Sequence, residues 1–168
     1  MIKSFILIIS TTMLLIACSG QDASDLMKQA DDLGSKGKTA EALALYEQIA
    51  KDFADTPEAP DAMIHCARIY INEQKDPVKA ATTYELVAEK YPQSEYGHRA
   101  LFAAAYTYAN DIGNLERGRE AYEKYLKQYP DSSMASTAKF ELDNLGKSPE
   151  ELLESLQSEH SADVSGNQ

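Results

Sequence analysis

Residues 121–132 read AYEKYLKQYPDS, and variants of this stretch stand earlier in the chain as TYELVAEKYPQS at 83–94 and LYEQIAKDFADT at 45–56. Each copy follows the previous one by 38 residues. The same step separates the members of four sets: Tyr46, Tyr84 and Tyr122; Phe53, Tyr91 and Tyr129; Ala62, Ala100 and Ala138; and Glu47, Glu85 and Glu123. Four sets of residues that all recur at the same interval indicate a repeat architecture.

Apolar residues within each copy follow the period of a helix. Ala80, Tyr84, Val87 and Tyr91 are spaced by four, three and four residues, which places them on one helix face. A single helical hairpin cannot bury such a face alone, so stacked hairpins must share it. Because a buried tyrosine removes about 150–250 Å² from water, we expect the repeated tyrosines to form the core.

The charged residues of each copy take the opposite face. Glu47 with Lys51, and Glu123 with Lys127, are i,i+4 pairs in the favourable order. Such pairs contribute only a few tenths of a kcal/mol. The repeated glutamate is therefore interpreted as a solvated helix residue and not as a catalytic carboxylate.

Helix boundaries are marked by proline and by capping residues. The copies end in Ala54, Pro92 or Pro130, followed two residues later by Thr56, Ser94 or Ser132 as expected N-caps. Asp76 before Pro77, and Asn114 in the next copy, begin the second helix of a unit. The expected helices are 22–36, 39–53, 57–73, 77–91, 95–111, 115–129 and 133–145.

A capping box of Ser148 and Glu151 around Pro149 predicts a further short helix within 146–157 that caps the stack. Residues 158–168 contain little to bury and are expected to form a disordered tail.

This pattern over residues 22–145 resembles the tetratricopeptide repeat, whose second helix carries a small residue, an aromatic four later and a proline eight after that. The matching positions are Ala42, Tyr46 and Ala54; Ala80, Tyr84 and Pro92; and Gly118, Tyr122 and Pro130. First helices show a small residue three before tyrosine, as in Ala67 with Tyr70 and Ala105 with Tyr108. The period is 38 and not 34, and Asp32 stands where the first unit should have its tyrosine. The resemblance implies an all-α, right-handed superhelix of helical hairpins, with about three repeats plus capping helices.

The N-terminus has the features of an export signal. Lys3 precedes an almost unbroken apolar run, Phe5 to Ala17, that is too short to span a membrane comfortably. The run closes on Leu15, Ile16, Ala17 and Cys18, which resembles the lipobox of bacterial lipoproteins. The resemblance implies a signal peptide at 1–17, a lipidated Cys18 in a short linker at 18–21, and, from Ser19, an outer-membrane location facing the periplasm. An uncleaved anchor, or a secretory signal with an incidental cysteine, is the alternative.

The net charge narrows the classes of partner that the protein can bind. The net charge of −11 becomes one unit more negative without residues 1–17, because that segment holds Lys3 and no acid. Such a surface repels phosphate backbones, so nucleic acid is not an expected partner.

Cys66 is the one cysteine left beside Cys18, and its apolar helical setting favours a small buried side chain over a reactive thiol.

Residue patterns for catalysis or metal binding are missing from the sequence. His65, His98 and His160 are scattered, and none belongs to an HExxH motif or a zinc-type cysteine pattern. The sequence holds neither a phosphate-binding glycine loop nor a GxSxG elbow. We therefore expect no enzyme activity, no cofactor and no metal.

In the tetratricopeptide family the first helix of each unit lines the concave side. Counting from the tyrosines at 70 and 108, the inward positions are Asp61, Ile64, Arg68 and Ile71, then Arg99, Phe102, Tyr106 and Ala109. Four of these form the candidate protein-binding set: Arg68, Arg99, Phe102 and Tyr106. The arginines suit a carboxylate and the aromatics an apolar anchor. The alternative is that they are solvated arginines beside core aromatics.

The combination of lipobox and repeats resembles two groups of envelope proteins. One is the lipoprotein subunit of the outer-membrane β-barrel assembly machinery, an acylated array of about five repeats, and the other is the Tol-Pal-associated periplasmic coordinator. The resemblance implies a lipid-anchored scaffold that binds envelope proteins or peptides through its groove, with the membrane reached through the lipid. A lipoprotein that holds extended or unfolded clients, in a chaperone-like or secretion-pilot role, is the second hypothesis.

Overall fold

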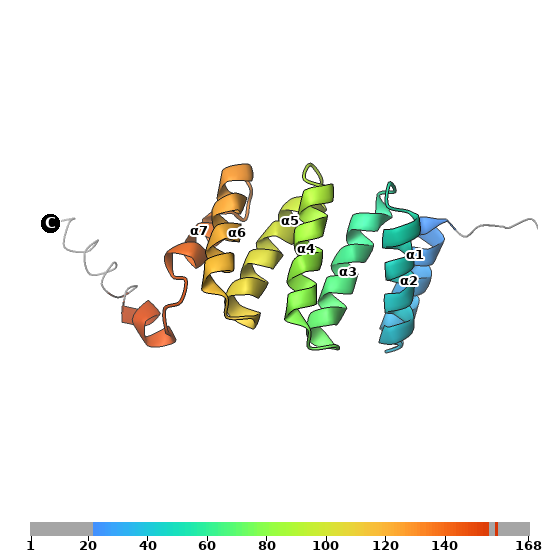
Figure 1. The fold of residues 1–168 in the computed structure, drawn as a ribbon, viewed down its shortest axis with the longest axis horizontal. Coiled ribbons are helices and arrows are strands. Elements are labelled where there is room, and N and C mark those ends of the chain that lie inside the picture. The colour runs from blue at the N-terminus through green and yellow to red at the C-terminus, as the bar shows by residue number, and fades with distance from the viewer. Residues whose placement is uncertain (1–21, 155–156, 158–168) are drawn as a thin grey trace, which may run out of the picture.

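The computed structural model describes residues 22–154 and 157, and this part of the chain is built from antiparallel helical hairpins placed side by side (Figure 1). Seven α-helices and one π-helical turn follow one another within its residues 23–143. They are α1 (Ala23–Ser35), α2 (Thr39–Asp52), α3 (Glu58–Asn72), α4 (Pro77–Lys90), α5 (Glu95–Tyr106), η1 (Thr107–Asp111), α6 (Leu115–Gln128) and α7 (Ala135–Asp143). The all-α array of helical hairpins expected from the repeats is confirmed.

Three of the expected helix caps are confirmed. The side chain of Ser94 accepts a hydrogen bond from the backbone N–H of Gly97, that of Asp76 from Lys79, and that of Asn114 from Arg117, at 3.0, 2.9 and 3.1 Å. Each bond satisfies one of the N–H groups that the first turn of a helix leaves without a partner.

The caps expected at Thr56 and Ser132 are wrong. The Thr56 hydroxyl donates back to the carbonyl of Phe53 at 2.9 Å, and α3 begins at Glu58 without a side-chain cap. Ser132 accepts from the N–H of Met134, and α7 begins only at Ala135, two residues later than expected. In both places the side-chain oxygen forms its hydrogen bond within a short turn that precedes the helix, and not with the first turn of the helix.

The last turn of the fifth expected helix differs from a regular α-helix. The stretch 95–111 is helical throughout, but Thr107–Asp111 forms a π turn in which the N–H of Ile112 donates to the Thr107 carbonyl at 3.0 Å. At the equivalent place in the preceding unit, Gln74 donates to Ile69 at 3.2 Å. The wider turn is therefore a repeated way of ending the first helix.

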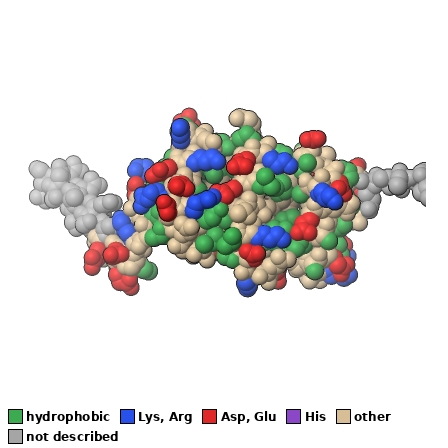
Figure 2. All heavy atoms as spheres, viewed as in Figure 1, with side chains coloured by type: hydrophobic (Ala, Val, Ile, Leu, Met, Phe, Trp, Pro, Cys, Tyr) green, Lys and Arg blue, Asp and Glu red, His purple; other side chains and the backbone are tan. Residues whose placement is uncertain are grey.

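Successive helices pack against their neighbours along the whole stack. In addition, α1 contacts α3 and α3 contacts α5, whereas α2, α4 and α6 make no comparable contacts with one another in the described helices. The first helices of the units therefore form the inner row of a curved stack, here called the concave face. Figure 2 shows the other face, that of α2, α4 and α6, on which acidic and basic side chains mix around apolar patches.

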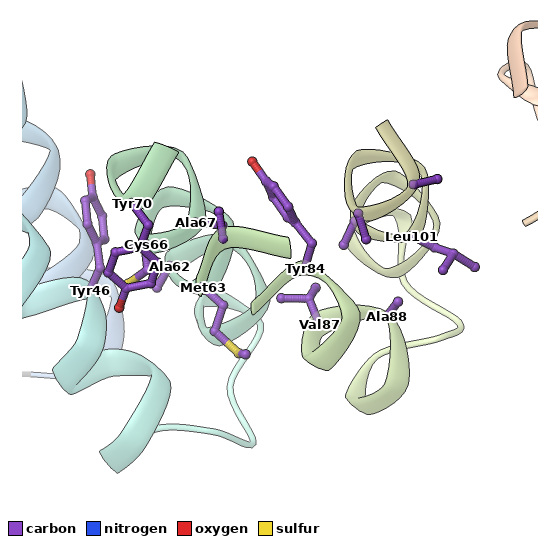
Figure 3. Close-up of a cluster of buried hydrophobic side chains, with 14 of the residues drawn as sticks. Tyr46, Ala62, Met63, Cys66, Ala67, Tyr70, Tyr84, Val87, Ala88 and Leu101 are labelled. Carbon is purple, nitrogen blue, oxygen red and sulfur yellow. The ribbon is translucent and has the colours of Figure 1, made fainter. Parts of the chain in front are cut away.

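The repeated tyrosines lie in the core, as the sequence predicts. Tyr46, Tyr84 and Tyr122 are almost fully buried, and they pack with aliphatic residues such as Val87 (Figure 3). Cys66 is buried in the same cluster, and burial raises the pKa of its thiol to about 12. At neutral pH this group is a protonated, apolar core residue, which confirms its sequence-based interpretation.

The repeated glutamate is exposed at Glu47 and Glu123, as interpreted from the sequence, and only partly exposed at Glu85. Glu47 accepts a hydrogen bond from the hydroxyl of Tyr70 at 2.6 Å, and Glu85 accepts one from Tyr108 at 2.8 Å. Each tyrosine belongs to the unit that follows its glutamate. At Glu47 and Glu85 the repeated glutamate therefore joins neighbouring units through a tyrosine hydroxyl.

A cation completes each of these junctions. The ammonium of Lys79 lies 3.9 Å from the centre of the Tyr70 ring, and the Arg117 guanidinium lies 4.7 Å from that of Tyr108. Arg117 also bonds Glu85 at 2.5 Å. These cations are again 38 residues apart, so the repeat specifies a three-residue junction.

A second repeated bond joins the loops of adjacent units. The hydroxyl of Tyr91 donates to the carbonyl of Ala54 at 2.7 Å, and that of Tyr129 donates to the carbonyl of Pro92 at 2.9 Å. Phe53 holds the same register in the first unit and has no hydroxyl to donate. The two bonds thus link the second unit to the first and the third unit to the second.

The C-terminal cap begins as predicted. The backbone N–H of Ser148 donates to Glu151 at 2.7 Å, and the N–H of Glu151 donates to the Ser148 hydroxyl at 3.2 Å. Residues 149–154 and 157 are helical. Leu153 remains 57% exposed, so a covering role of this segment stays a prediction.

Candidate protein-binding groove

A hollow of about 320 Å³ lies between α3 and α5 on the concave face, and we call it the α3–α5 groove. Arg68 lines it from α3, and Arg99 and Phe102 line it from α5. Three of the four residues predicted for the binding set therefore share one hollow. The remainder of its wall has an apolar part, Ile64, Ala100, Ala103 and Met134, and a polar part, Asp61, His65 and Tyr84.

Helix geometry explains how these residues come together. Asp61, Ile64 and Arg68 are three and four residues apart, so they project from one face of α3. Arg99 and Phe102 occupy on α5 the registers that Asp61 and Ile64 hold on α3. Since α3 and α5 are neighbours in the inner row, the two faces border the same hollow.

The two groove arginines have no partner among the residues that the structure describes. Arg68 and Arg99 are exposed, and neither forms a hydrogen bond or ion pair with any residue between 22 and 154. Arg117, by contrast, is bound to Glu85. The groove thus presents two unpaired guanidinium groups, each able to donate charge-assisted hydrogen bonds to a carboxylate.

Tyr84 adds a third donor that the sequence did not indicate. Its ring is buried in the core, but its hydroxyl end reaches the groove and makes no hydrogen bond to another described residue. Figure 3 shows the Tyr46 and Tyr84 hydroxyls on one side of the stack and that of Tyr70 on the other. Burial raises the Tyr84 pKa, which Arg68 partly offsets, so the hydroxyl is protonated at neutral pH.

Phe102 is fixed in the groove wall by the core behind it. Its ring meets Tyr122 and Tyr125 edge-on, with centroids 5.7 and 5.8 Å apart. Edge-to-face contacts of this kind hold an aromatic ring in place. The partly buried ring therefore serves the core and at the same time offers a rigid apolar surface.

The fourth predicted residue lies elsewhere. Tyr106 is 45% exposed and does not line the α3–α5 groove. Ala109, another expected inward position, is buried where α6 crosses: a Cβ on Gly118 would lie 2.9 Å from the Ala109 Cβ. Tyr106 is the last residue of α5 and Ala109 lies in η1, so both lie beyond the part of α5 that lines the groove.

A second hollow of about 310 Å³ adjoins the first, between α1, α2 and α3; we call it the α1–α3 groove. His65 and Arg68 line both hollows. The His65 ring stacks on Tyr46, with centroids 4.7 Å apart and planes 10° from parallel, and the Tyr46 hydroxyl donates to Asp31 at 2.7 Å. No role for His65 was predicted from the sequence; its place three residues before Arg68, on the same helix face, was the available signal.

Comparisons with known families agree with this architecture. Two models, each described as tetratricopeptide repeat, match residues 27–95 and 99–132, and together they cover more than half of the 168 residues. The chain belongs to the tetratricopeptide-repeat family. No curated protein matches the chain at a significant level. Repeats of this kind typically form non-catalytic scaffolds for protein–protein interaction, which identifies proteins as the general class of partner.

Other kinds of site receive no support within residues 22–154. No three His, Cys, Asp or Glu side chains gather there in a group that would hold a metal ion. No helix of this part of the chain has both the length and the apolar content to cross a bilayer. Cys18, the signal segment 1–17 and the tail at 158–168 lie outside the described residues.

Proposed function

We propose that this protein is a lipid-anchored scaffold of the bacterial cell envelope that holds a segment of another envelope protein in the α3–α5 groove. The observation that carries the binding half is the joint presence, in one hollow, of two unpaired guanidinium groups and an unpaired tyrosine hydroxyl beside an apolar wall. Donors without internal partners are favourable for a ligand because no internal bond must be broken when it binds.

The chemistry of the groove favours a segment that is acidic and apolar. Arg68 and Arg99 present planar donor groups that match the geometry of a carboxylate. Phe102 and the neighbouring aliphatic side chains offer a surface for one bulky apolar residue. The groove is open to solvent along the inner row, so we expect it to take an extended chain.

The anchoring half of the proposal rests on the N-terminal sequence. Leu15, Ile16, Ala17 and Cys18 fit a lipoprotein processing site, and Ser19 favours the outer membrane with the protein facing the periplasm. The four steps from Cys18 to Asp22 span at most about 14 Å when fully extended. A short lipid tether of this kind concentrates the groove beside membrane-bound partners and raises their effective concentration.

The same combination supports a role of this scaffold in cell-envelope biogenesis, of the outer-membrane assembly type. An acylated array with YPQS at 91–94 and YPDS at 129–132 resembles the lipoprotein subunit of the β-barrel assembly machinery. The structure describes three complete hairpins and a seventh helix, so we propose a smaller scaffold of the same type.

A quantitative pull-down from mildly solubilised envelopes tests the groove. We expect the lipidated protein to retain one stoichiometric partner that Arg68→Glu with Arg99→Glu removes. A matched control, Arg119→Glu on α6, changes the charge of an exposed arginine outside the groove and should retain the partner. Capture of many proteins, unchanged by the double substitution, would refute the groove and favour the client-holding role.

Fractionation tests the anchor separately. Labelled palmitate should enter the wild-type protein and not Cys18→Ser, and the variant should leave the membrane fraction in a carbonate wash. If Cys18→Ser remains membrane-bound, the lipid-anchor assignment is wrong, whatever the groove binds.

A further inference from the structure

The two hollows of the concave face differ in charge. The α3–α5 groove is lined by Arg68, Arg99 and one carboxylate, Asp61, so cations predominate there. The α1–α3 groove is lined by two carboxylates, those of Asp31 on α1 and Glu73 at the end of α3, and shares Arg68, so acids predominate there. A ligand that spans both hollows therefore meets an acidic half and a basic half.

The carboxylates of Asp31 and Glu73 in the acidic half have oxygens that can accept hydrogen bonds from a ligand. Asp31 receives the Tyr46 hydroxyl on Oδ1 at 2.7 Å, which leaves its second oxygen for another donor. Glu73 is exposed and forms no ion pair with a described side chain. Carboxylates placed in this way attract a cationic side chain, and most strongly the forked guanidinium of arginine.

The wall between the hollows is rigid and shared. His65 is stacked against Tyr46, and Arg68 lies one turn further along the same face of α3. Asp61 is 3.9 Å from the His65 ring nitrogen Nε2 and belongs to the rim of the basic half. A bound chain must therefore cross α3 over the His65 and Arg68 side chains to touch both halves.

The spacing of the halves follows from helix packing. Because α1, α3 and α5 are consecutive neighbours in the inner row, the centres of the two hollows lie about one helix spacing apart, or roughly 8–10 Å. In a polyproline II chain, residues i and i+3 face the same side and are about 9 Å apart. A chain in this conformation can therefore place residue i over one hollow and residue i+3 over the other.

We propose, resting on the function proposed above, that the α1–α3 and α3–α5 grooves together bind one extended segment. This segment carries a cationic side chain and a carboxylate three residues apart. The cation lies between Asp31 and Glu73. The carboxylate lies against Arg68, Arg99 and the Tyr84 hydroxyl. The recognised feature is thus a charge pattern, and an acidic segment that lacks the cation is bound more weakly.

Fluorescence anisotropy with labelled ten-residue peptides tests the charge pattern. The probe is an alanine–proline peptide with one arginine, one aspartate three residues away and one leucine beside the aspartate. It is prepared in both sequence directions. Replacing its arginine by glutamate should weaken binding to the wild-type protein about three- to fivefold, which is the upper part of the range for a solvent-exposed ion pair.

A charge exchange tests the position of the cation. Glu73→Lys should bind the arginine peptide about three- to fivefold more weakly and should regain affinity for the peptide in which glutamate replaces arginine. Glu123→Lys, an equal charge change on α6 outside both grooves, should behave as wild type. Circular dichroism of each variant confirms that the helices are intact.

The outcomes separate this inference from the proposed function. If Arg68→Glu abolishes peptide binding while Glu73→Lys changes nothing, the charge pattern is refuted and the groove assignment stands. If the double substitution Arg68→Glu, Arg99→Glu leaves peptide binding unchanged, the groove assignment itself fails. Equal binding of both peptides by the wild-type protein, or no binding of the arginine peptide at millimolar concentration, also refutes the charge pattern.

Discussion

Replacing Lys75 by glycine should stabilise the protein. Gly37, Lys75 and Gly113 occupy one register of the repeat, in the turn between the two helices of a unit, and all three have positive φ: 73°, 56° and 74°. Left-handed backbone costs a residue with a Cβ about 1–2 kcal/mol. Glycine loses about 0.5–1 kcal/mol more conformational entropy on folding. The difference predicts that Lys75→Gly raises the free energy of unfolding by about 0.5–1 kcal/mol.

The same register supplies the reverse experiment. No heavy atom lies within 4 Å of a Cβ placed on Gly113, so Gly113→Lys adds backbone strain without a clash and should lower stability by a similar amount. Lys75→Ala removes the charge of Lys75 but keeps a Cβ, and should stay within about 0.5 kcal/mol of wild type.

Urea unfolding followed by circular dichroism measures these differences, and a change of 1 kcal/mol corresponds to about 2–4 °C in Tm for a domain of this size. A Lys75→Gly variant no more stable than Lys75→Ala would show that the lysine is not strained. The reasoning would then fail, whatever happened at Gly113.

Three further predictions concern packing and pH. Gly97→Ala should destabilise by more than about 2 kcal/mol, because the new Cβ would lie 2.1 Å from the Tyr91 carbonyl oxygen, which is backbone and cannot turn aside; thermal unfolding measures this, and a change below 0.5 kcal/mol contradicts it. Tyr91→Phe removes the hydroxyl bonded to the Ala54 carbonyl and should cost about 1 kcal/mol in urea unfolding; an unchanged midpoint would show that the loop junction is dispensable. Burial, followed by the bond to Glu85, raises the pKa of Tyr108 from 10.0 to about 12. Its contribution to stability is therefore complete below pH 10 and is lost as the pH rises through 12, since the unfolded chain ionises first. Unfolding followed between pH 9 and 12 should show a shallower loss of stability for Tyr108→Phe, and parallel curves would refute the assignment.

The order and register of the helices were readable from the chain alone. Tyr46, Tyr84 and Tyr122 repeat at 38 residues and are all buried. Asp76 and Asn114 cap the helices that they precede. These features depend on residues three to four apart, and such local geometry is the same in every helix.

The candidate groove was predictable only in part. Arg68, Arg99 and Phe102 line one hollow, because repeat registers on α3 and α5 determine which faces meet. Tyr106 was expected with them but lies outside it. The hydroxyl of Tyr84 was overlooked, because a residue assigned to the core gives no sign in the sequence of where its far end emerges.

By itself, the sequence determined the helical hairpins, their period and the residues that face the core, because hydrophobic periodicity and capping act within one or two turns. Only the tertiary structure decided which side chains meet across units. Glu85 bonds Tyr108 from the next hairpin, and His65 lies in the wall between two hollows. Contacts of this kind depend on the angle and distance at which whole hairpins pack, and those are set by all the interlocking side chains of an interface together and not by any single local pattern.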